Sequence, residues 1–217
     1  MNRNYSGIAE LPTHLRIFPL SGILLLPRGQ LPLNIFEPRY VDMVDDALKS
    51  DRLIGMVQPA GDSNNSQKLH SIGCVGRLTQ ISETGDGRYM LTLHGVARFH
   101  LIREIVSKDT FRTFEVDYTK FEHDLIDEDK AVTIDRHRLL NILKMFADIA
   151  GVQIDLRGTD TMSTEVLINA LATLGTFEPS EKQALLEAPN LAARAELLSV
   201  LAELASAKKT HGGDTIQ

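Results

Sequence analysis

The spacing of apolar residues changes once along the chain, near residue 121, and this change constrains the fold more than any other feature. Before it, apolar residues come in short alternating or continuous runs broken by Gly and Pro, which is typical of β-strands. From about residue 131 they recur every three or four positions, which is typical of amphipathic helices. The sequence therefore predicts an α+β protein, with a β-rich domain over residues 11–121 and a helical domain over residues 131–208.

Short runs of apolar and β-branched residues predict the strands of the first domain. They cover residues 15–20, 31–36, 53–57, 72–81, 88–94, 96–106 and 111–121. Gly95 separates two of these runs, and we expect a bulge, a tight turn or a close approach of backbone at this position. Several short strands separated by turn signals favour a closed barrel or a sandwich.

Helices are expected in both domains. Glu37-Pro38 starts one among the strands, because Pro suits the first turn of a helix. Its apolar face comprises Tyr40, Val44, Ala47 and Leu48, and its Asp residues at 42, 45 and 46 turn outward. Four helices follow, over about 139–150, 163–174 and 180–188 and from Pro189 onward, with Gly151 and Gly175 ending the first two. The acidic segment 122–130 is interpreted as a linker, and residues 209–217 as a flexible tail.

Charge and apolar runs exclude several classes of partner. The first 120 residues carry 14 Lys and Arg against 13 Asp and Glu, whereas residues 121–217 carry 9 against 16. This balance disfavours nucleic-acid binding, which depends on neutralised phosphates. The longest apolar run, residues 23–26, is too short for a signal peptide or a membrane span. A single Cys fits a reducing compartment, so we expect a cytoplasmic protein with no membrane partner.

The residues that could carry catalysis or bind a metal do not form a known pattern. The seven His are scattered, and Cys74 lies in an apolar run where a buried thiol is usual. The acidic residues between 124 and 129 lack the Gly and the final Glu of a calcium-binding loop. We therefore expect no catalytic residue, no metal and no cofactor.

Several motifs resemble the N-terminal, substrate-binding domain of Lon proteases. The most specific covers residues 18–20, 25–29 and 31–40 and ends in Glu37-Pro38-Arg39-Tyr40. Segments 72–75, 93–99 and 179–187 follow in the order of the family, so the resemblance spans about residues 14–204. It implies a PUA-like β-barrel followed by a C-terminal helical bundle.

The resemblance also implies a function. It favours a non-enzymatic module that recognises unfolded or damaged polypeptides and works with a partner such as a protease or a chaperone. The sequence has no Gly-x-x-x-x-Gly-Lys-Ser/Thr loop to hold phosphates and no segment for a Ser-Lys peptidase. Two alternatives stay open: RNA binding, which PUA-like barrels of other families perform, and a small-molecule pocket, as cereblon-like domains possess. The oligomeric state is not predicted.

Arg28, Arg39, Tyr40 and Arg98 are the candidate binding residues. All four lie in the family-like motifs, and Arg39 and Arg98 each precede an aromatic residue. As polar anchors they would line a ligand groove; the structural alternative is that their guanidinium groups bind strand carbonyls or a carboxylate such as Glu37. We expect the binding surface in a cleft between the two domains, where an extended peptide adds to a sheet edge.

Overall fold

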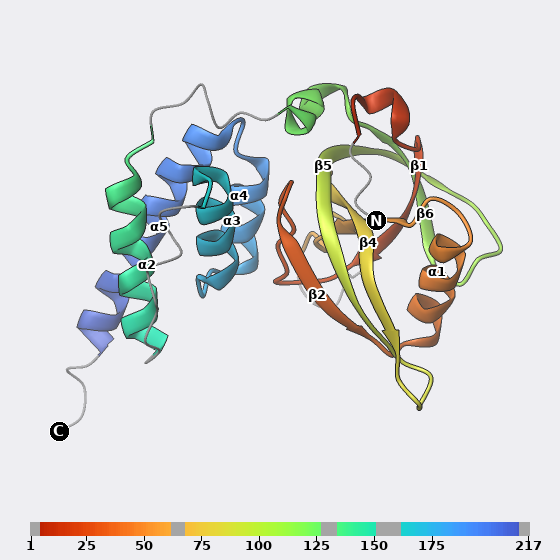
Figure 1. Ribbon diagram of the computed structural model, residues 1–217, viewed down its shortest axis with the longest axis horizontal. Coiled ribbons are helices and arrows are strands. Elements are labelled where there is room, and N and C mark those ends of the chain that lie inside the picture. The colour runs from red at the N-terminus through yellow and green to blue at the C-terminus, as the bar shows by residue number, and fades with distance from the viewer. Residues whose placement is uncertain (1–4, 62–67, 127–133, 151–161, 213–217) are drawn as a thin grey trace. The chain divides into compact units, whose positions relative to one another are not determined.

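The computed structural model describes residues 5–61, 68–126, 134–150 and 162–212. The chain divides into two compact units, residues 1–126 and 127–217, which we call the barrel unit and the helical unit (Figure 1). The barrel unit contains a mixed sheet and the helical unit contains four of the helices. The protein is therefore α+β, as the sequence predicts.

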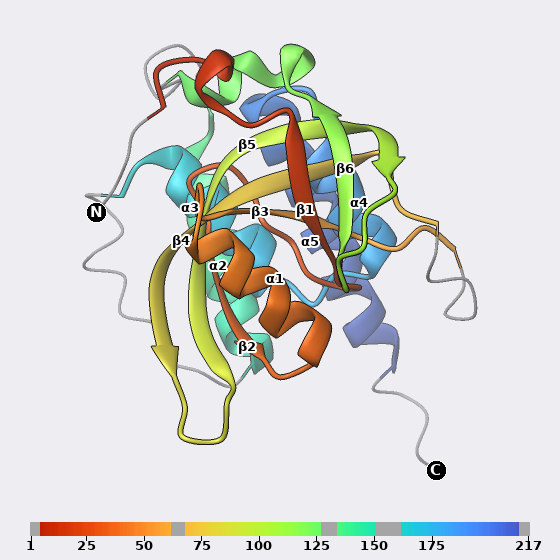
Figure 2. The same ribbon diagram turned by 90° about the vertical axis from the view of Figure 1, so that its right-hand side faces the viewer.

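Six strands and one α-helix form the barrel unit. The strands are β1 (His14–Pro19), β2 (Gln30–Ile35), β3 (Leu53–Val57), β4 (Ile72–Glu83), β5 (Tyr89–Ile105) and β6 (Arg112–Asp117). Helix α1 (Pro38–Leu48) follows β2, and two 3₁₀ helices, η1 (Ile8–Glu10) and η2 (Thr119–Leu125), lie near the two ends of the unit's chain. In Figure 2 the hairpin between β4 and β5 projects beyond the rest of this unit.

The sheet closes on itself through its longest strand. The strand order is β2-β5-β4-β3-β1-β6, and β5 also pairs with β6. Strand β5 can pair with both β2 and β6 because β2 opposes its residues 89–94 and β6 opposes residues 100–105. All neighbours are antiparallel except β1 and β3. The other five strands thus form a closed ring, and β2 lies outside it, paired with β5.

The alternation of apolar residues along these strands fills the ring with a core. The buried apolar residues of this core come from all strands of the ring and include Leu15, Ile17, Leu53, Val57, Val75, Ala97, Phe99, Phe114, Val116 and Tyr118. Each large aliphatic or aromatic side chain buried in this way contributes about 1.5–3 kcal/mol to folding.

The two predicted strands on either side of Gly95 form one continuous strand, β5, so the predicted break between them is absent. A bulge is present: Gly76 opposes Gly95 and Val75 opposes Ala97, so one residue of β5 is extra. The close backbone approach is also present, since a Cβ on Gly95 would lie 2.0 Å from the carbonyl oxygen of Leu26.

Helix α1 forms where Glu37-Pro38 predicts it, with Pro38 in its first turn. Its buried face comprises Tyr40, Met43, Val44 and Ala47. The Asp residues on its other side do not simply face solvent, because each accepts a hydrogen bond from another element. Thr110 Oγ1 donates to Asp42 at 2.7 Å, Tyr89 Oη donates to Asp45 at 2.7 Å, and Arg16 donates to Asp46.

The predicted linker differs from the structure in its first part. Residues 122–125 belong to η2, which packs against β5, and Phe121 and Asp124 are buried. Asp124 is buried because it forms an ion pair with Arg98, so the interpretation of this residue as part of a solvated linker is wrong. Residues 127–130 lie outside the described part of the chain.

The helical unit contains α2 (Arg136–Ala150), α3 (Thr164–Leu174), α4 (Pro179–Glu187) and α5 (Leu191–Gly212). Helices α2, α3 and α5 pack against one another, and α4 packs against α5. Ser163 Oγ accepts a hydrogen bond from Val166 N at 3.2 Å and Gly175 ends α3, as predicted. Gly151, the expected end of α2, lies outside the described residues.

Helix α5 continues to Gly212, into the segment that the sequence predicts to be a flexible tail from residue 209. Ala and Lys, which are frequent near this end, are strong helix formers. In the described ranges, no helix combines the length and the apolar character that crossing a bilayer requires.

Candidate functional site

Arg28 lies in the turn that precedes β2. Its backbone is in the left-handed region, with φ of 61°, and its N–H donates to the Gly95 carbonyl at 2.8 Å. Its guanidinium Nη2 donates to the carbonyl of Ile126 at 2.6 Å. The pKa of His94 is lowered, first by burial and second by the positive charge of Arg28. Arg28 therefore connects the start of β2, the middle of β5 and the end of the barrel unit.

Arg39 and Tyr40 lie at the first turn of α1. Arg39 is exposed, and its Nη2 donates to the Glu37 carboxylate at 2.8 Å, which is the structural alternative that the sequence raises. Its guanidinium carbon lies 4.5 Å from the centre of the Tyr40 ring. Tyr40 is buried against Phe18, with ring centres 4.3 Å apart, and burial is the main cause of its raised pKa. Of these two residues, only Arg39 is available to a ligand.

Arg98 is 1% exposed and is held by Asp124. The main-chain N–H and Nε of Arg98 both donate to one carboxylate oxygen at 2.9 Å, and Nη2 donates to the other at 2.7 Å. The guanidinium also lies over the Phe121 ring, 4.6 Å from its centre. Arg98 therefore fastens η2 to β5 from inside the barrel unit.

The structure thus places the four candidate residues in different surroundings. Two of them, Tyr40 and Arg98, are buried, and the two that reach the surface, Arg28 and Arg39, contact different partners. The binding function of these four residues stays a prediction.

A surface that the sequence did not indicate lies on the three-stranded extension, which we define as β2, residues 89–94 of β5 and residues 79–83 of β4. It carries a shallow hollow of about 460 Å³. Two cross-strand rows of side chains line this hollow: Pro32, Thr92 and Gln80, and Asn34, Met90 and Ser82. Between the rows, Leu33, Leu91 and Ile81 expose main chain, because their side chains point to the opposite face.

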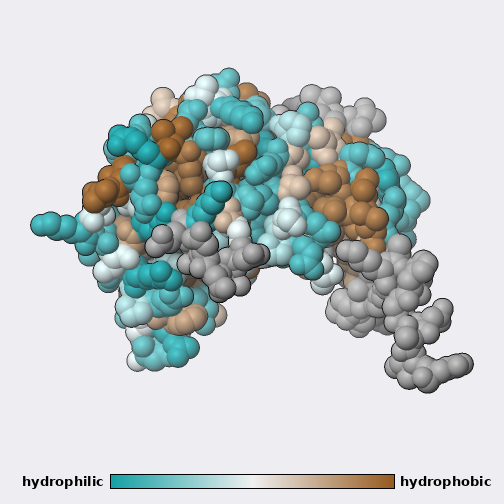
Figure 3. Space-filling model, turned by 180° about the vertical axis from the view of Figure 1, so that it is seen from behind, coloured by the Kyte–Doolittle hydropathy of each residue, from teal (hydrophilic) through white to brown (hydrophobic). Residues whose placement is uncertain are grey.

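Exposed apolar side chains lie on the three-stranded extension or next to it, and that of Ile81 is on the face opposite the hollow. Phe36 follows β2 and is 62% exposed, Met90 in β5 is 59% exposed, and Ile81 in β4 is 42% exposed. Figure 3 shows apolar surface, in brown, among hydrophilic residues on the molecule. The signal for Met90 was present in the sequence, since an apolar residue alternates there with the buried Leu91 and Leu93 and must face outward.

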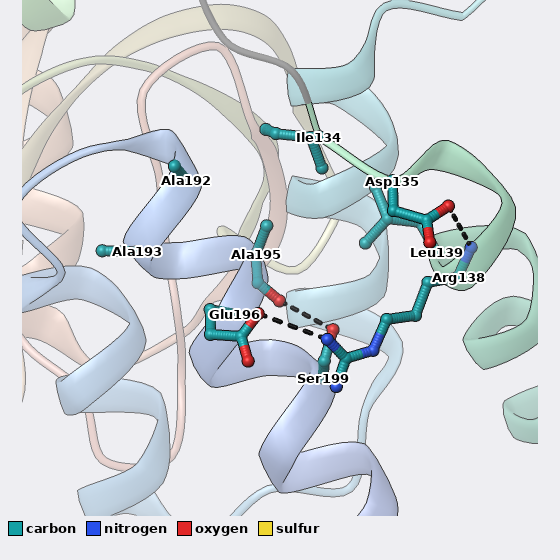
Figure 4. A pocket seen from close by; sticks show the side chains of 9 residues that line it. All are labelled: Ile134, Asp135, Arg138, Leu139, Ala192, Ala193, Ala195, Glu196 and Ser199. Carbon is teal, nitrogen blue, oxygen red and sulfur yellow. Dashed lines mark hydrogen bonds and ion pairs between the residues drawn. The ribbon is translucent and has the colours of Figure 1, made fainter.

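A second hollow, of about 410 Å³, lies in the helical unit between the start of α2 and α5 (Figure 4). Its apolar wall comprises Ile134, Leu139, Ala192, Ala193 and Ala195. Arg138 extends along it and donates to Glu196 at 3.2 Å and to Glu203 at 2.9 Å, and the Glu203 hydrogen bond is the main cause of its raised pKa. Arg138, the cation of this hollow, is therefore paired with two carboxylates.

Neither hollow, as the described residues line it, contains a group of side chains that could hold a metal ion. In the residues that the structure describes, no three His, Cys, Asp or Glu side chains are grouped to hold a metal ion. His94 and His100 lie on the same strand, β5, and do not face each other. His94 is opposite Gln30 of β2 and Arg77 of β4, whereas His100 is opposite Ile72 of β4 and Asp117 of β6. Cys74 is buried, as the sequence predicts.

A closed mixed sheet with one long strand, followed by a helical unit, defines an α+β protein of two compact units. The model of the ATP-dependent protease La (LON) substrate-binding domain matches residues 14–203, and the chain belongs to this family. Two solved structures share the fold. The Lon N-terminal domain protein from Xanthomonas campestris has a TM-score of 0.60 at 23% identity and covers 86% of this chain and 97% of that one. The N-terminal domain of Mycobacterium avium complex Lon protease has a TM-score of 0.57 at 14% identity and covers 88% and 98%.

Similar curated proteins are much longer than this chain. Lon protease 2 of Myxococcus xanthus is 25% identical over 199 residues, which are 87% of this chain and 23% of that protein. Lon protease of Flavobacterium johnsoniae is 26% identical over 192 residues, with coverage of 86% and 23%. The chain therefore spans about 23% of the length of these relatives.

Proposed function

We propose that this chain recognises polypeptides, and that it binds unfolded or damaged protein segments through the three-stranded extension of the barrel unit. The observation that carries the proposal is that this extension combines a shallow hollow with exposed apolar side chains, those of Met90 and Ile81 and, directly after β2, that of Phe36. Its family, a substrate-binding domain, supports the same function.

The chemistry of this surface suits many different sequences. Its side chains are apolar or uncharged polar, so no fixed charge on the client is required. Thr92 Oγ1 donates to Gln80 Oε1 at 3.2 Å, which satisfies part of the polar wall in the absence of a client. An unfolded client loses conformational entropy on binding, so we expect dissociation constants on the order of micromolar.

The predicted binding residues take different parts in this proposal. Arg39 is exposed in the first turn of α1, which follows β2, and contacts the client directly. Arg28, Tyr40 and Arg98 position the strands, because their side chains bind other parts of the barrel unit.

The remaining predictions from the sequence are part of the same proposal. We propose a PUA-like barrel over residues 11–121 and a helical bundle over 131–208, which act in the cytoplasm without an enzymatic activity of their own. The partners are polypeptide clients and a protease or chaperone that receives them. The RNA-binding alternative gains no support from the family match.

Fluorescence anisotropy tests the proposal. The probe is labelled α-lactalbumin that has been reduced and carboxymethylated, so that it stays unfolded, and the competitor is the native form of the same protein. We expect micromolar binding of the unfolded form and no competition by the native form. Equal binding of both forms, or binding of neither far above micromolar concentration, contradicts polypeptide recognition.

A further inference from the structure

The orientation of the main chain in the three-stranded extension follows from one hydrogen bond at the tip of its hairpin. Thr84 N donates to the Arg88 carbonyl at 2.8 Å, so these two residues form a hydrogen-bonded pair. In antiparallel strands such pairs alternate with pairs whose N–H and C=O groups point away from each other. Ser82 therefore faces Met90 with its main-chain groups, whereas Ile81 and Glu83 direct theirs away from β5.

The outer edge of β4 is uncovered along this part of the strand. Strand β3 pairs with β4 only as far as Arg77, and Leu78 N donates to the Arg52 carbonyl at 2.9 Å. Within the described part of the chain, no strand other than β5 pairs with β4 beyond that point. Residues 80–83 are all exposed. The N–H and C=O groups of Ile81 and Glu83 therefore face solvent at a strand edge.

The other edge of the extension is different. Gly95 N donates to the Gly29 carbonyl at 2.9 Å, so Gly95 directs its main-chain groups toward β2. Because this direction alternates along a strand, Leu93, Leu91 and Tyr89 do the same. Leu31, Leu33 and Ile35 pair with them, which leaves Gln30, Pro32 and Asn34 facing outward. Pro32 has no N–H, and Pro at such a position is a common protection of an edge against added strands. The middle of the β2 edge thus cannot donate a hydrogen bond.

We propose that an extended polypeptide segment binds by adding as a strand to the β4 edge at residues 79–83, and not to the β2 edge. This inference rests on the proposed function and specifies how the polypeptide is bound. The main-chain groups of Ile81 and Glu83 bond the client backbone, which every sequence possesses, while the exposed side chains of Ile81 and Met90 favour apolar client residues. The client is a segment without Pro that has β-branched or other apolar residues at alternate positions.

Backbone methylation of a peptide probe separates this mode from binding by side chains alone. The probes are three labelled forms of an acetylated, amidated peptide of sequence KTVTVTK: unmethylated, N-methylated at alternate residues so that one edge stays intact, and N-methylated at all central residues. Strand addition predicts that the first two bind within a factor of about two and that the third binds at least about fivefold more weakly, because the net value of each lost hydrogen bond is modest. Equal binding of all three forms overturns it.

Three substitutions locate the edge on the protein. Ile81→Pro removes the outward N–H without breaking a bond to β5, and Ile81→Val is its matched control, which keeps the N–H. We expect I81P to weaken binding of the unmethylated peptide about fivefold and I81V to leave it within about twofold. Pro32→Thr, which adds an N–H to the β2 edge, should not strengthen it. A gain with Pro32→Thr, together with unchanged binding by I81P, would place the client at the β2 edge instead.

Amide hydrogen exchange of the wild-type protein provides a measurement that does not depend on the folding of I81P. The amides of Ile81 and Glu83 should exchange rapidly in the free protein and slow at least about tenfold when the peptide is bound, while those of Gln30 and Asn34 do not change. Unchanged exchange at Ile81 and Glu83 with bound peptide overturns strand addition. If unfolded α-lactalbumin binds but methylation has no effect, only this inference fails, and if neither probe binds, the proposed function fails with it.

Discussion

Asp124 holds Arg98 from a position 26 residues further along the chain, by accepting hydrogen bonds from both its main-chain N–H and its guanidinium. Both residues are buried. The contact holds η2 against β5, just before the barrel unit ends at Ile126. An ion pair of this kind is costly to break, because the residue that remains is a buried charge without its partner.

Asp124→Asn tests the importance of this pair for stability. We expect the free energy of unfolding of the barrel unit to fall by about 3–5 kcal/mol, because the charge of Arg98 is then buried and uncompensated. Glu37→Gln is the control, since it breaks the exposed Glu37–Arg39 pair and should cost about 0–1 kcal/mol. Urea denaturation measures both values. Similar small losses in the two variants would mean that Arg98 finds other partners.

The strands and α1 could be predicted because their signals are local. Alternating apolar residues mark the buried face of a strand, and Pro38 marks the start of a helix. The pair of Arg98 and Asp124 could not, because nothing near either residue indicates the other, and an acidic run ordinarily faces solvent. Closure of the sheet through the pairing of β5 with β6 is likewise a matter of tertiary geometry.

Gly95→Ala tests the close approach in the middle of β5. A Cβ there would meet the Leu26 carbonyl carbon at 2.8 Å as well as its oxygen, and backbone cannot move aside as a flexible side chain can. We expect a loss of about 1–3 kcal/mol in the free energy of unfolding. The control is Gly85→Ala in the β4–β5 hairpin, where nothing lies within 4 Å of the added Cβ. Thermal melting compares the two variants. Equal melting temperatures would show that the backbone at Leu26 and the Arg28–Gly29 turn can move aside without a loss of stability.

Arg28→Gln tests the electrostatic contact between the turn and His94. The pKa of His94 is lowered mainly by burial and secondly by Arg28, so the substitution should raise it without restoring the ordinary value of 6.5. A lowered pKa of His94 in the folded state means that, as the pH drops, the unfolded state takes up the proton at a higher pH than the folded state does. The free energy of unfolding of the wild type therefore falls as the pH drops below 6.5. In the variant this decrease should be smaller. NMR titration of the imidazole measures the pKa, with Arg39→Gln as the control that leaves it unchanged.

The candidate surface shows the same limit of sequence reasoning. That Met90 faces outward follows from its alternation with Leu91 and Leu93. Its assembly with Pro32 and Gln80 into one hollow depends on strand registers, including the bulge between Leu78 and Gln80, which no local pattern specifies. The motif residues drew attention because they are distinctive, yet the structure uses Arg98 and Tyr40 inside the barrel unit.

Tyr89→Phe tests the link between the three-stranded extension and α1. The hydrogen bond from Tyr89 Oη to Asp45 is the main cause that raises the pKa of Tyr89 to about 12. A raised pKa means that this contact stabilises the fold fully below pH 10.0, the ordinary value, and that its contribution is lost as the pH rises to about 12. Wild type should therefore exceed Tyr89→Phe in stability at neutral pH, and the difference should vanish over that interval. Ultraviolet titration of tyrosinate should show the pKa falling in Asp45→Asn; a Tyr89 that already titrates near 10.0 contradicts the contact.

Replacing the exposed apolar side chains next to the hollow tests where clients bind. Phe36 and Met90 are more than half exposed, so changing both to Ser removes apolar surface without opening a cavity in the core. We expect the Phe36→Ser, Met90→Ser double variant to keep its melting temperature. Its affinity for reduced, carboxymethylated α-lactalbumin should fall at least about tenfold, because burying such side chains is worth about 1.5–3 kcal/mol each when complete.

Val106→Ser is the matched control for this variant. Val106 is 99% exposed in the loop between β5 and β6, outside the three-stranded extension, so its replacement also lowers surface hydrophobicity. If apolar exposure anywhere on the barrel unit were sufficient for binding, V106S would weaken the affinity as well. Anisotropy titrations that show a loss only in the double variant place the client on the extension, whereas equal affinities for wild type and the double variant move the binding surface elsewhere.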